Sequence, residues 1–187
     1  MKVLLGISNR HVHLTEDDYK TLFGDEPLEK VKDLVQPGEY ASNQKVSIKT
    51  EKSVINNVRL LGPLRSYSQV EISKTDSFTL GVKPPVRNSG DLENAAEVTI
   101  VGPKGEVTKE CCIIAARHLH INTNDLEKYD LVGVEKVKAR IESEKATVFE
   151  DVYVKSSPNY ELELHLDTDD GNGSLAKTGD EVEIIKY

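Results

Sequence analysis

Hydrophobic and polar residues alternate with a period of two along most of this chain, which is the pattern of half-buried β-strands. Clusters of Gly, Pro, Ser and Asn separate the alternating segments and indicate turns. Because the strands are short and closely spaced, the pattern favours small β-barrels over a parallel α/β sheet. Strands are expected at residues 45–50, 54–61, 69–73, 97–101, 134–141, 146–155, 160–166 and 181–186.

Two short helices are predicted, and each follows a copy of the same motif. The first runs from Thr15 to Phe23, with Thr15 as the N-cap and Asp18 three residues later. The second is expected at residues 122–129. The preceding segments, SNRHVHLTEDDY at 8–19 and AARHLHINTNDL at 115–126, share Arg-His-x-His and each follows an apolar stretch. We interpret them as a duplicated unit, and two barrels related by an approximate two-fold axis would bring both copies to one seam.

Composition excludes several classes of function. The chain has 187 residues and a formal net charge of −8, which argues against binding to nucleic acid because that binding needs clustered Lys and Arg. No apolar run reaches the roughly 20 residues of a membrane span. The start, MKVLLGISNR, lacks the features of a secretory signal, so a cytoplasmic protein is expected. Cys111 and Cys112 are adjacent and are interpreted as two buried strand thiols rather than as metal ligands.

The histidines carry the strongest chemical signal. Four of the five form two His-x-His pairs, His11 with His13 and His118 with His120, and the fifth is His165. Residues i and i+2 of a strand point the same way, so two imidazoles can reach one ion or two neighbouring ions. Neutral imidazole suits Zn²⁺, and ligands from separate segments are typical of a catalytic site. The alternative is that all five histidines are structural.

Carboxylates and arginines near these motifs extend the candidate site. Glu71 is a candidate carboxylate ligand, although its spacing alone fits an ordinary strand charge. The carboxylates after His165 either orient histidine rings or form a turn; they are Asp167, Asp169 and Asp170. Guanidinium groups bind phosphate through two parallel hydrogen bonds, so an anionic substrate follows if arginines converge on the metal. The candidates are Arg10, Arg65, Arg87 and Arg117.

At these motifs the chain resembles the PduL-type phosphotransacylases, also called phosphate propanoyltransferases. The motifs are SNRHVHL (8–14), GPLRSYSQVEIS (62–73), PPVRNSGD (84–91), IIAARHLHI (113–121) and HLDTDD (165–170). The resemblance covers nearly the whole chain in the same order. It implies a mainly β fold of two small β-barrel domains with short helices, related by a pseudo-two-fold axis. The first domain is expected at 10–115, and the second at 1–9 and 116–187, with the N-terminal strand crossing into the C-terminal barrel.

The resemblance also implies a site and a reaction. Two zinc ions are expected at the domain seam, held by His11, His13, Glu71, His118, His120 and His165, with Arg65 as the catalytic, phosphate-binding arginine. Arg10, Arg87 and Arg117 remain possible substrate-binding residues. The implied reaction transfers an acetyl or propanoyl group reversibly between coenzyme A and phosphate, so the small-molecule partners are acyl-CoA, phosphate and acyl phosphate. A homodimer is possible, and no nucleic acid or membrane partner is expected.

Two departures from the family pattern and two alternatives remain. The residues Asp170-Gly171-Asn172-Gly173 replace a helical Glu-Ala-Asn-Ala, and two glycines disfavour a helix there and would loosen the substrate pocket. The N-terminus also lacks the amphipathic segment of members targeted to microcompartments, which favours a free cytosolic enzyme. The alternatives are a dinuclear metallohydrolase of a phosphate ester or thioester, and a non-catalytic double-barrel module that binds metal or nucleotide. Acyl-chain preference and metal identity stay open.

Overall fold

The computed structural model describes residues 1–187 and has two compact units. Unit 1 comprises Met1–Asn9, Val35–Pro37 and Ala116–Tyr187, and unit 2 comprises Arg10–Leu34 and Gly38–Ala115. Each unit has its own apolar core, built around Leu5 and Leu119 in unit 1 and around Val12 and Leu60 in unit 2. The mainly β fold is therefore confirmed. The boundaries of independently folding domains stay a prediction.

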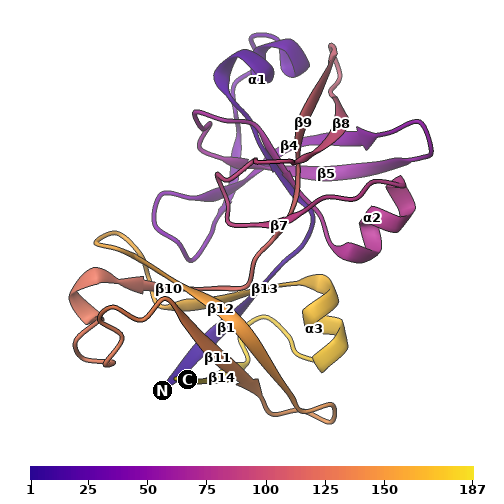
Figure 1. Ribbon diagram of the computed structural model, residues 1–187. Coiled ribbons are helices and arrows are strands. Elements are labelled where there is room, and N and C mark those ends of the chain that lie inside the picture. Colours follow the sequence, from indigo (N-terminus) through magenta and orange to yellow (C-terminus); the bar gives the residue numbers. More distant parts are fainter. The chain divides into compact units, whose positions relative to one another are not determined.

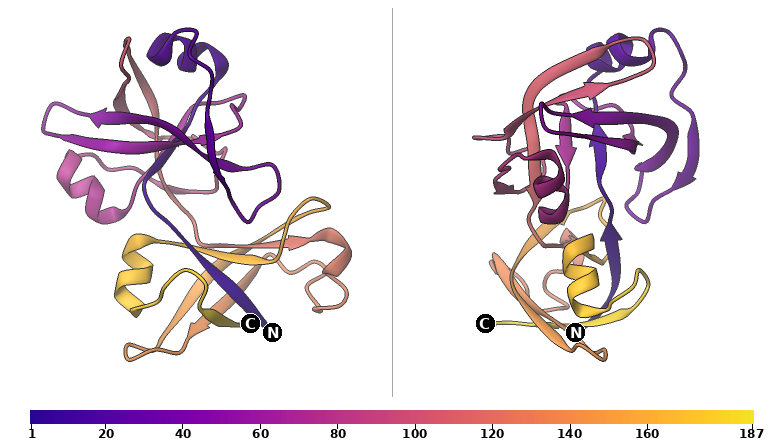
Figure 2. Two further views of the ribbon diagram at one scale, coloured as in Figure 1. Left: turned by 180° about the vertical axis from the view of Figure 1, so that it is seen from behind. Right: turned by 90° about the vertical axis from the view of Figure 1, so that its right-hand side faces the viewer.

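Unit 1 is a closed six-stranded barrel in the order β1-β13-β10-β12-β11-β14. Its N-terminal strand β1 pairs with β13 and β14, so the expected crossing of this strand into the C-terminal barrel is confirmed (Figure 1). Both chain termini lie in this unit (Figure 2). The strands are β1 (Lys2–Ser8), β10 (His118–Asn122), β11 (Lys136–Ile141), β12 (Thr147–Ser157), β13 (Glu163–Asp167) and β14 (Glu181–Ile185).

Unit 2 has the same strand connectivity. Its ring runs β4-β5-β2-β6-β9-β8 and closes because β8 pairs with both β9 and β4. Two short strands, β3 (Lys30–Asp33) and β7 (Val86–Arg87), extend this ring at β4 and β9. The ring strands are β2 (His11–His13), β4 (Tyr40–Lys49), β5 (Val54–Gly62), β6 (Gln69–Glu71), β8 (Ala96–Val101) and β9 (Glu106–Ala115).

The two His-x-His strands occupy equivalent places in the two rings. In unit 2, β2 pairs in parallel with β5 and antiparallel with β6. In unit 1, β10 pairs in parallel with β12 and antiparallel with β13. The strand before each motif is exchanged as well, since β1 precedes β2 but belongs to unit 1, and β9 precedes β10 but belongs to unit 2. The repeated motif in the sequence therefore corresponds to the same pattern of strand pairing in both units.

The first predicted helix is confirmed and the second is wrong. Helix α1 (Glu16–Phe23) begins after Thr15, whose side chain accepts from the Asp18 backbone N–H. At residues 122–129 only a 3₁₀ turn, η1 (Thr123–Asp125), forms. A run of hydrogen-bonded turns follows it, and Asp130 then enters the left-handed region with φ of 55°.

Two further helices begin at the ends of the strands that pair with the His-x-His strands. Helix α2 (Lys74–Leu80), which the sequence analysis missed, follows β6 and starts at a capping box made by Ser73 and Asp76. Helix α3 (Thr168–Ser174) follows β13 and is capped by Asp167, which accepts from the Asp170 backbone N–H at 2.9 Å. The expectation that the glycines prevent a helix here is wrong, because the cap and the packing of α3 outweigh their low propensity. No helix of the chain combines the length and the apolar character of a membrane span.

Candidate functional site

Unit 2 gathers His11, His13 and Glu71, which we call the mixed cluster. Strands β2 and β6 are antiparallel, and His11 stands directly opposite Glu71. The two histidines point to one side of β2 while Val12 points into the apolar core. The three side chains are buried, and one ligand atom from each lies within 4.8 Å of the others. His11 Nε2 lies 3.5 Å from Glu71 Oε2.

Unit 1 gathers His118, His120 and His165, which we call the three-histidine cluster. His118 stands opposite His165 in the antiparallel pair of β10 and β13. The ring centroids lie 4.7 Å apart for His118 and His120, 5.0 Å for His118 and His165, and 4.7 Å for His120 and His165. One ligand nitrogen from each ring again lies within 4.8 Å of the others. Within each unit, the structure brings together the residues that the sequence analysis assigned to metal.

The protonation and hydrogen bonding of these residues fit a bound metal ion. His13 Nδ1 and His120 Nδ1, which hold equivalent places in the two clusters, are buried without a hydrogen-bond partner. Such atoms are rare in proteins and call for a partner of another kind. Burial, aided by the neighbouring His118 and His165, lowers the pKa of His120 to about 2, and burial with His11 and Arg65 lowers the pKa of His13. Both rings are therefore neutral and offer a lone pair, as zinc requires.

One further ring has its hydrogen position set by the backbone. His118 Nδ1 lies 2.8 Å from the Ala116 carbonyl oxygen, which can only accept. In a neutral His118 ring the hydrogen is therefore on Nδ1, and Nε2 is the unprotonated nitrogen. The donor sets, three imidazoles in unit 1 and two imidazoles with one carboxylate in unit 2, are both typical of catalytic zinc sites.

Arg65 lies in unit 2 and is held rigidly. Its Nη1 donates to the Tyr67 hydroxyl at 3.1 Å and to Ser89 Oγ at 3.2 Å, and its Nη2 donates to Glu39 Oε1 at 2.6 Å. Ser89 Oγ also accepts from Gln69 Nε2 at 2.8 Å, and Gln69 donates to Glu71, so a chain of hydrogen bonds connects Arg65 to the mixed cluster. A guanidinium has five N–H donors, so three protein contacts leave two N–H groups for a ligand.

Two supporting residues were missed by the sequence analysis. Gln69 Nε2 donates to Glu71 Oε1 at 2.6 Å, and Glu163 Oε2 accepts from His165 Nε2 at 2.6 Å. Each stands two positions before a cluster residue on the same strand, and therefore on the same face. That spacing is a signal in the sequence, since a polar residue that shares a strand face with a candidate ligand can hold that ligand by a hydrogen bond.

The other three candidate arginines contact acidic or backbone groups. Arg10 Nε donates to Asp76 in α2 at 3.0 Å. At the equivalent place in unit 1, Arg117 makes two parallel hydrogen bonds to Asp170 in α3, at 2.8 and 2.9 Å. Arg87 Nε donates to the Glu93 carbonyl at 3.1 Å. These contacts give all three arginines a structural role, and their substrate-binding role stays a prediction.

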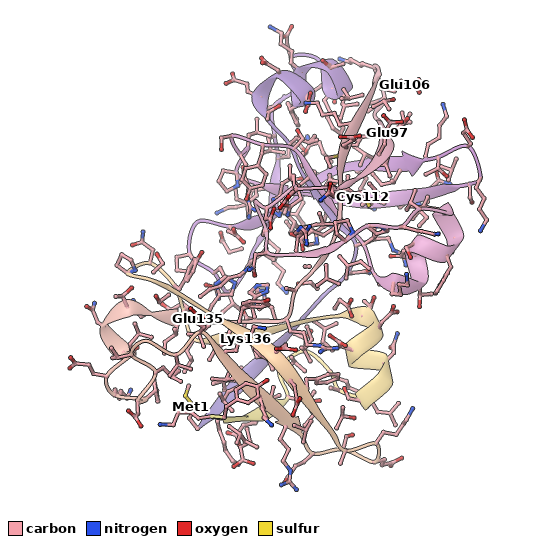
Figure 3. All side chains as sticks on the ribbon, in the orientation of Figure 1. Met1, Glu97, Glu106, Cys112, Glu135 and Lys136 are labelled. Atoms are coloured by element: carbon pink, nitrogen blue, oxygen red, sulfur yellow. The ribbon has the colours of Figure 1, made fainter.

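Neither cysteine is placed for nucleophilic chemistry. Both side chains are buried on β9 within the apolar core of unit 2, which confirms the sequence interpretation. Cys112 is labelled in Figure 3 and lies among the strands of this unit. Burial raises the pKa of the Cys111 thiol to about 12 and raises that of Cys112 as well. Thiols of this kind stay protonated and unreactive at neutral pH.

Comparison with known proteins gives one consistent result. The family model for phosphate propanoyltransferase matches residues 4–177. The phosphate propanoyltransferase of Thermotoga maritima is 46% identical, with the match covering 99% of this chain and 90% of that protein. Those of Priestia megaterium and Citrobacter freundii are 45% and 44% identical, covering 95% and 92% of this chain and 83% of each relative. The resemblance read from the motifs is therefore confirmed.

Proposed function

This chain belongs to the phosphate propanoyltransferase family and is an acyltransferase, and we propose that it exchanges a short acyl group between coenzyme A and inorganic phosphate at two zinc ions. The single observation that carries the proposal is the pair of equivalent ligand clusters, one in each barrel. We infer that each cluster holds one ion and that the two ions form a dinuclear centre. Acetyl and propanoyl groups are the expected substrates.

The bound ions would stabilise the thiolate of coenzyme A and polarise the acyl carbonyl. The residues of the chain would bind and orient the phosphate. Arg65 has two N–H donors left and binds phosphate, which places a phosphate oxygen for attack on the acyl carbon. The carbon–sulfur bond breaks as the carbon–oxygen bond forms, and coenzyme A leaves as the thiolate.

Transfer is proposed to be direct, without an acyl-enzyme. A covalent route needs a nucleophile that is deprotonated and accessible. Cys111 and Cys112 are buried, and burial raises the pKa of both thiols. Acyl-CoA and phosphate must then be bound together, so initial rates measured while both concentrations vary will show intersecting rather than parallel double-reciprocal lines.

Assay of the purified protein with coenzyme A and acetyl or propanoyl phosphate tests the proposal. Thioester should form, a chelator should abolish the activity, and added Zn²⁺ should restore it. Loss of thioester from acyl-CoA in the absence of phosphate would instead indicate a metallohydrolase. Bound metal without turnover on either acyl phosphate would indicate a non-catalytic module.

The proposal extends to partners and location. The net charge of −8 supports small-molecule partners and no nucleic acid. A cytoplasmic location, the lack of a membrane partner and a homodimer stay predictions. Sedimentation equilibrium of the zinc-loaded protein measures the oligomeric state.

A further inference from the structure

Glu163 is a buried carboxylate directly beside the three-histidine cluster. It lies on β13 two residues before His165, and only 6% of its surface is exposed. Its Oε2 accepts from His165 Nε2 at 2.6 Å and from Gln36 Nε2 at 3.1 Å. Because a carboxylate can only accept, this contact puts the hydrogen of a neutral His165 ring on Nε2 and leaves the lone pair on Nδ1.

The position of Glu163 is fixed from several directions. Gln36 comes from the Val35–Pro37 segment of unit 1, is 3% exposed, and also donates to the Glu161 carbonyl at 3.1 Å while accepting from the Glu161 N–H at 3.3 Å. On β1, Gly6 stands opposite His165. A Cβ at Gly6 would lie 2.7 Å from Glu163 Oε1, so only glycine leaves room for the carboxylate as it is placed. The surroundings therefore hold one orientation of Glu163.

The charge of Glu163 needs a compensating cation. Burial of a carboxylate is costly unless the charge is paired. Neither Lys nor Arg forms an ion pair with Glu163, and His165 is its one ionisable partner. A cation bound at Nδ1 on the other side of the His165 ring would balance the carboxylate through the imidazole.

In the mixed cluster a neighbouring side chain also holds a candidate ligand, but here the neighbour is the hydrogen-bond donor and the ligand is the acceptor. Gln69 stands two residues before Glu71 and donates to it, while its own Oε1 accepts from the Gly90 N–H at 2.8 Å. The carboxylate ligand of unit 2 is thus held by an amide donor, and the imidazole ligand of unit 1 is held by a carboxylate acceptor. The mixed cluster thus includes a carboxylate as a candidate ligand, whereas the carboxylate beside the three-histidine cluster, Glu163, contacts a candidate ligand instead.

We propose that Glu163 is a positioning residue that presents Nδ1 of His165 to a metal ion and supplies the negative charge that the three-histidine cluster itself lacks. This inference rests on the proposed zinc centre. It assigns a role to a side chain that would not touch the ion or the substrates. Gln36 and Gly6 then serve the site by holding Glu163.

Zinc titration of the metal-free protein against a chromophoric chelator tests this role. We expect wild-type protein to bind two Zn²⁺ ions, and Glu163→Gln to bind one of them about 10–100-fold more weakly, because partners of metal ligands typically affect affinity by that factor. The matched control is Glu161→Gln, which removes a charge from an exposed side chain of the same segment and should bind both ions as the wild type does. Equal zinc affinities for Glu163→Gln and wild type would overturn the proposal.

Nitrogen NMR of the metal-free wild type gives a test that needs no variant to fold. His165 should be the Nε2–H tautomer, and Nδ1–H would contradict the proposed role of Glu163. Gln36→Ala, which removes the donor to Glu163 together with the two hydrogen bonds between Gln36 and Glu161, should weaken binding of the same zinc ion by a smaller factor. A wild type that binds no zinc would refute the metal centre itself. If the wild type binds two ions and transfers acyl groups, and Glu163→Gln binds zinc with the same affinities, only the role of Glu163 is refuted.

Discussion

Glu71 and His165 occupy the same position in the strand pairing of the two barrels. Glu71 lies opposite His11 on the antiparallel partner of β2, and His165 lies opposite His118 on the antiparallel partner of β10. The duplicated fold therefore offers two ligand sets that differ in one residue. A site with a carboxylate ligand and a site with imidazoles alone bind the same ion with different charge, so the two proposed zinc ions should not be equivalent.

Replacing Glu71 should abolish one of the two proposed zinc sites and leave the other. Glu71→Gln removes the charged ligand of the mixed cluster and leaves the three-histidine cluster intact. Elemental analysis of the purified variant should give one zinc ion per chain where the wild type has two, with acyl transfer lost. The matched control is Glu97→Gln on the exposed side of β8, which should keep both ions (Figure 3). Two ions in Glu71→Gln would contradict the assignment of Glu71 as a ligand.

Arg65 tests the phosphate site independently of the metals. Lysine keeps the charge but lacks the planar fork of donors, so Arg65→Lys should lower kcat/KM for acyl phosphate by about 10–100-fold, which corresponds to about 1.4–2.7 kcal/mol. The zinc content should stay at the wild-type value. Steady-state kinetics with acetyl phosphate measure the effect, and Arg140→Lys on an exposed side chain of unit 1 is the control. Unchanged kinetics would remove Arg65 from the mechanism.

The sequence predicts the histidine clusters because their geometry is local. Residues i and i+2 of a strand share a face regardless of the rest of the fold, so His11 and His13 must point the same way. Glu71 is different, since only the antiparallel register of β6 with β2 puts it opposite His11. Strand register depends on contacts distant in sequence, which is why only the family resemblance, and not the spacing, marked Glu71.

The errors of the sequence analysis have a tertiary origin. A helix was expected at residues 122–129, where the local pattern suits one, but the chain forms only η1 and then turns at Asp130. A helix was not expected at Gly171 and Gly173, yet α3 forms there because Asp167 caps it and Gly171 packs against Ile7. Propensity is a weak guide when packing and capping contribute more than about 1 kcal/mol each.

Asp18 makes the stability of unit 2 depend on pH. Its carboxylate, within the first turn of α1, accepts from Lys109 Nζ at 2.5 Å and from the Ser68 hydroxyl. Burial alone would raise the pKa of Asp18, but the hydrogen bonds from Lys109 and Ser68 outweigh it and lower the pKa below its ordinary value. A lowered pKa in the folded state means that the carboxylate stabilises the fold above the unfolded pKa of about 3.9. That stabilisation is lost as the pH falls through the folded pKa.

Asp18→Asn should therefore destabilise the protein at neutral pH by about 1.5–3 kcal/mol, the usual contribution of hydrogen bonds to charged groups. Urea denaturation at pH 7 and near pH 3 measures the difference, which should shrink at the lower pH as the wild-type carboxylate becomes protonated. Asp17→Asn, at the exposed neighbouring position, is the control and should change little. A difference between Asp18→Asn and wild type that stays constant with pH would contradict the assigned pKa shift.

The two glycines of α3 should respond oppositely to alanine. A Cβ at Gly173 meets nothing within 4 Å, so Gly173→Ala should stabilise the protein by about 0.5–1 kcal/mol through helix propensity and reduced freedom of the unfolded chain. A Cβ at Gly171 would lie 2.6 Å from Ile7 Cδ1, and overpacking of this kind costs about 1–3 kcal/mol, which exceeds the same gain. Urea denaturation of both variants at one pH should place Gly171→Ala below Gly173→Ala in unfolding free energy. Equal stability would mean that Ile7 moves aside freely, and that Gly171 is not needed for the packing of α3 on β1.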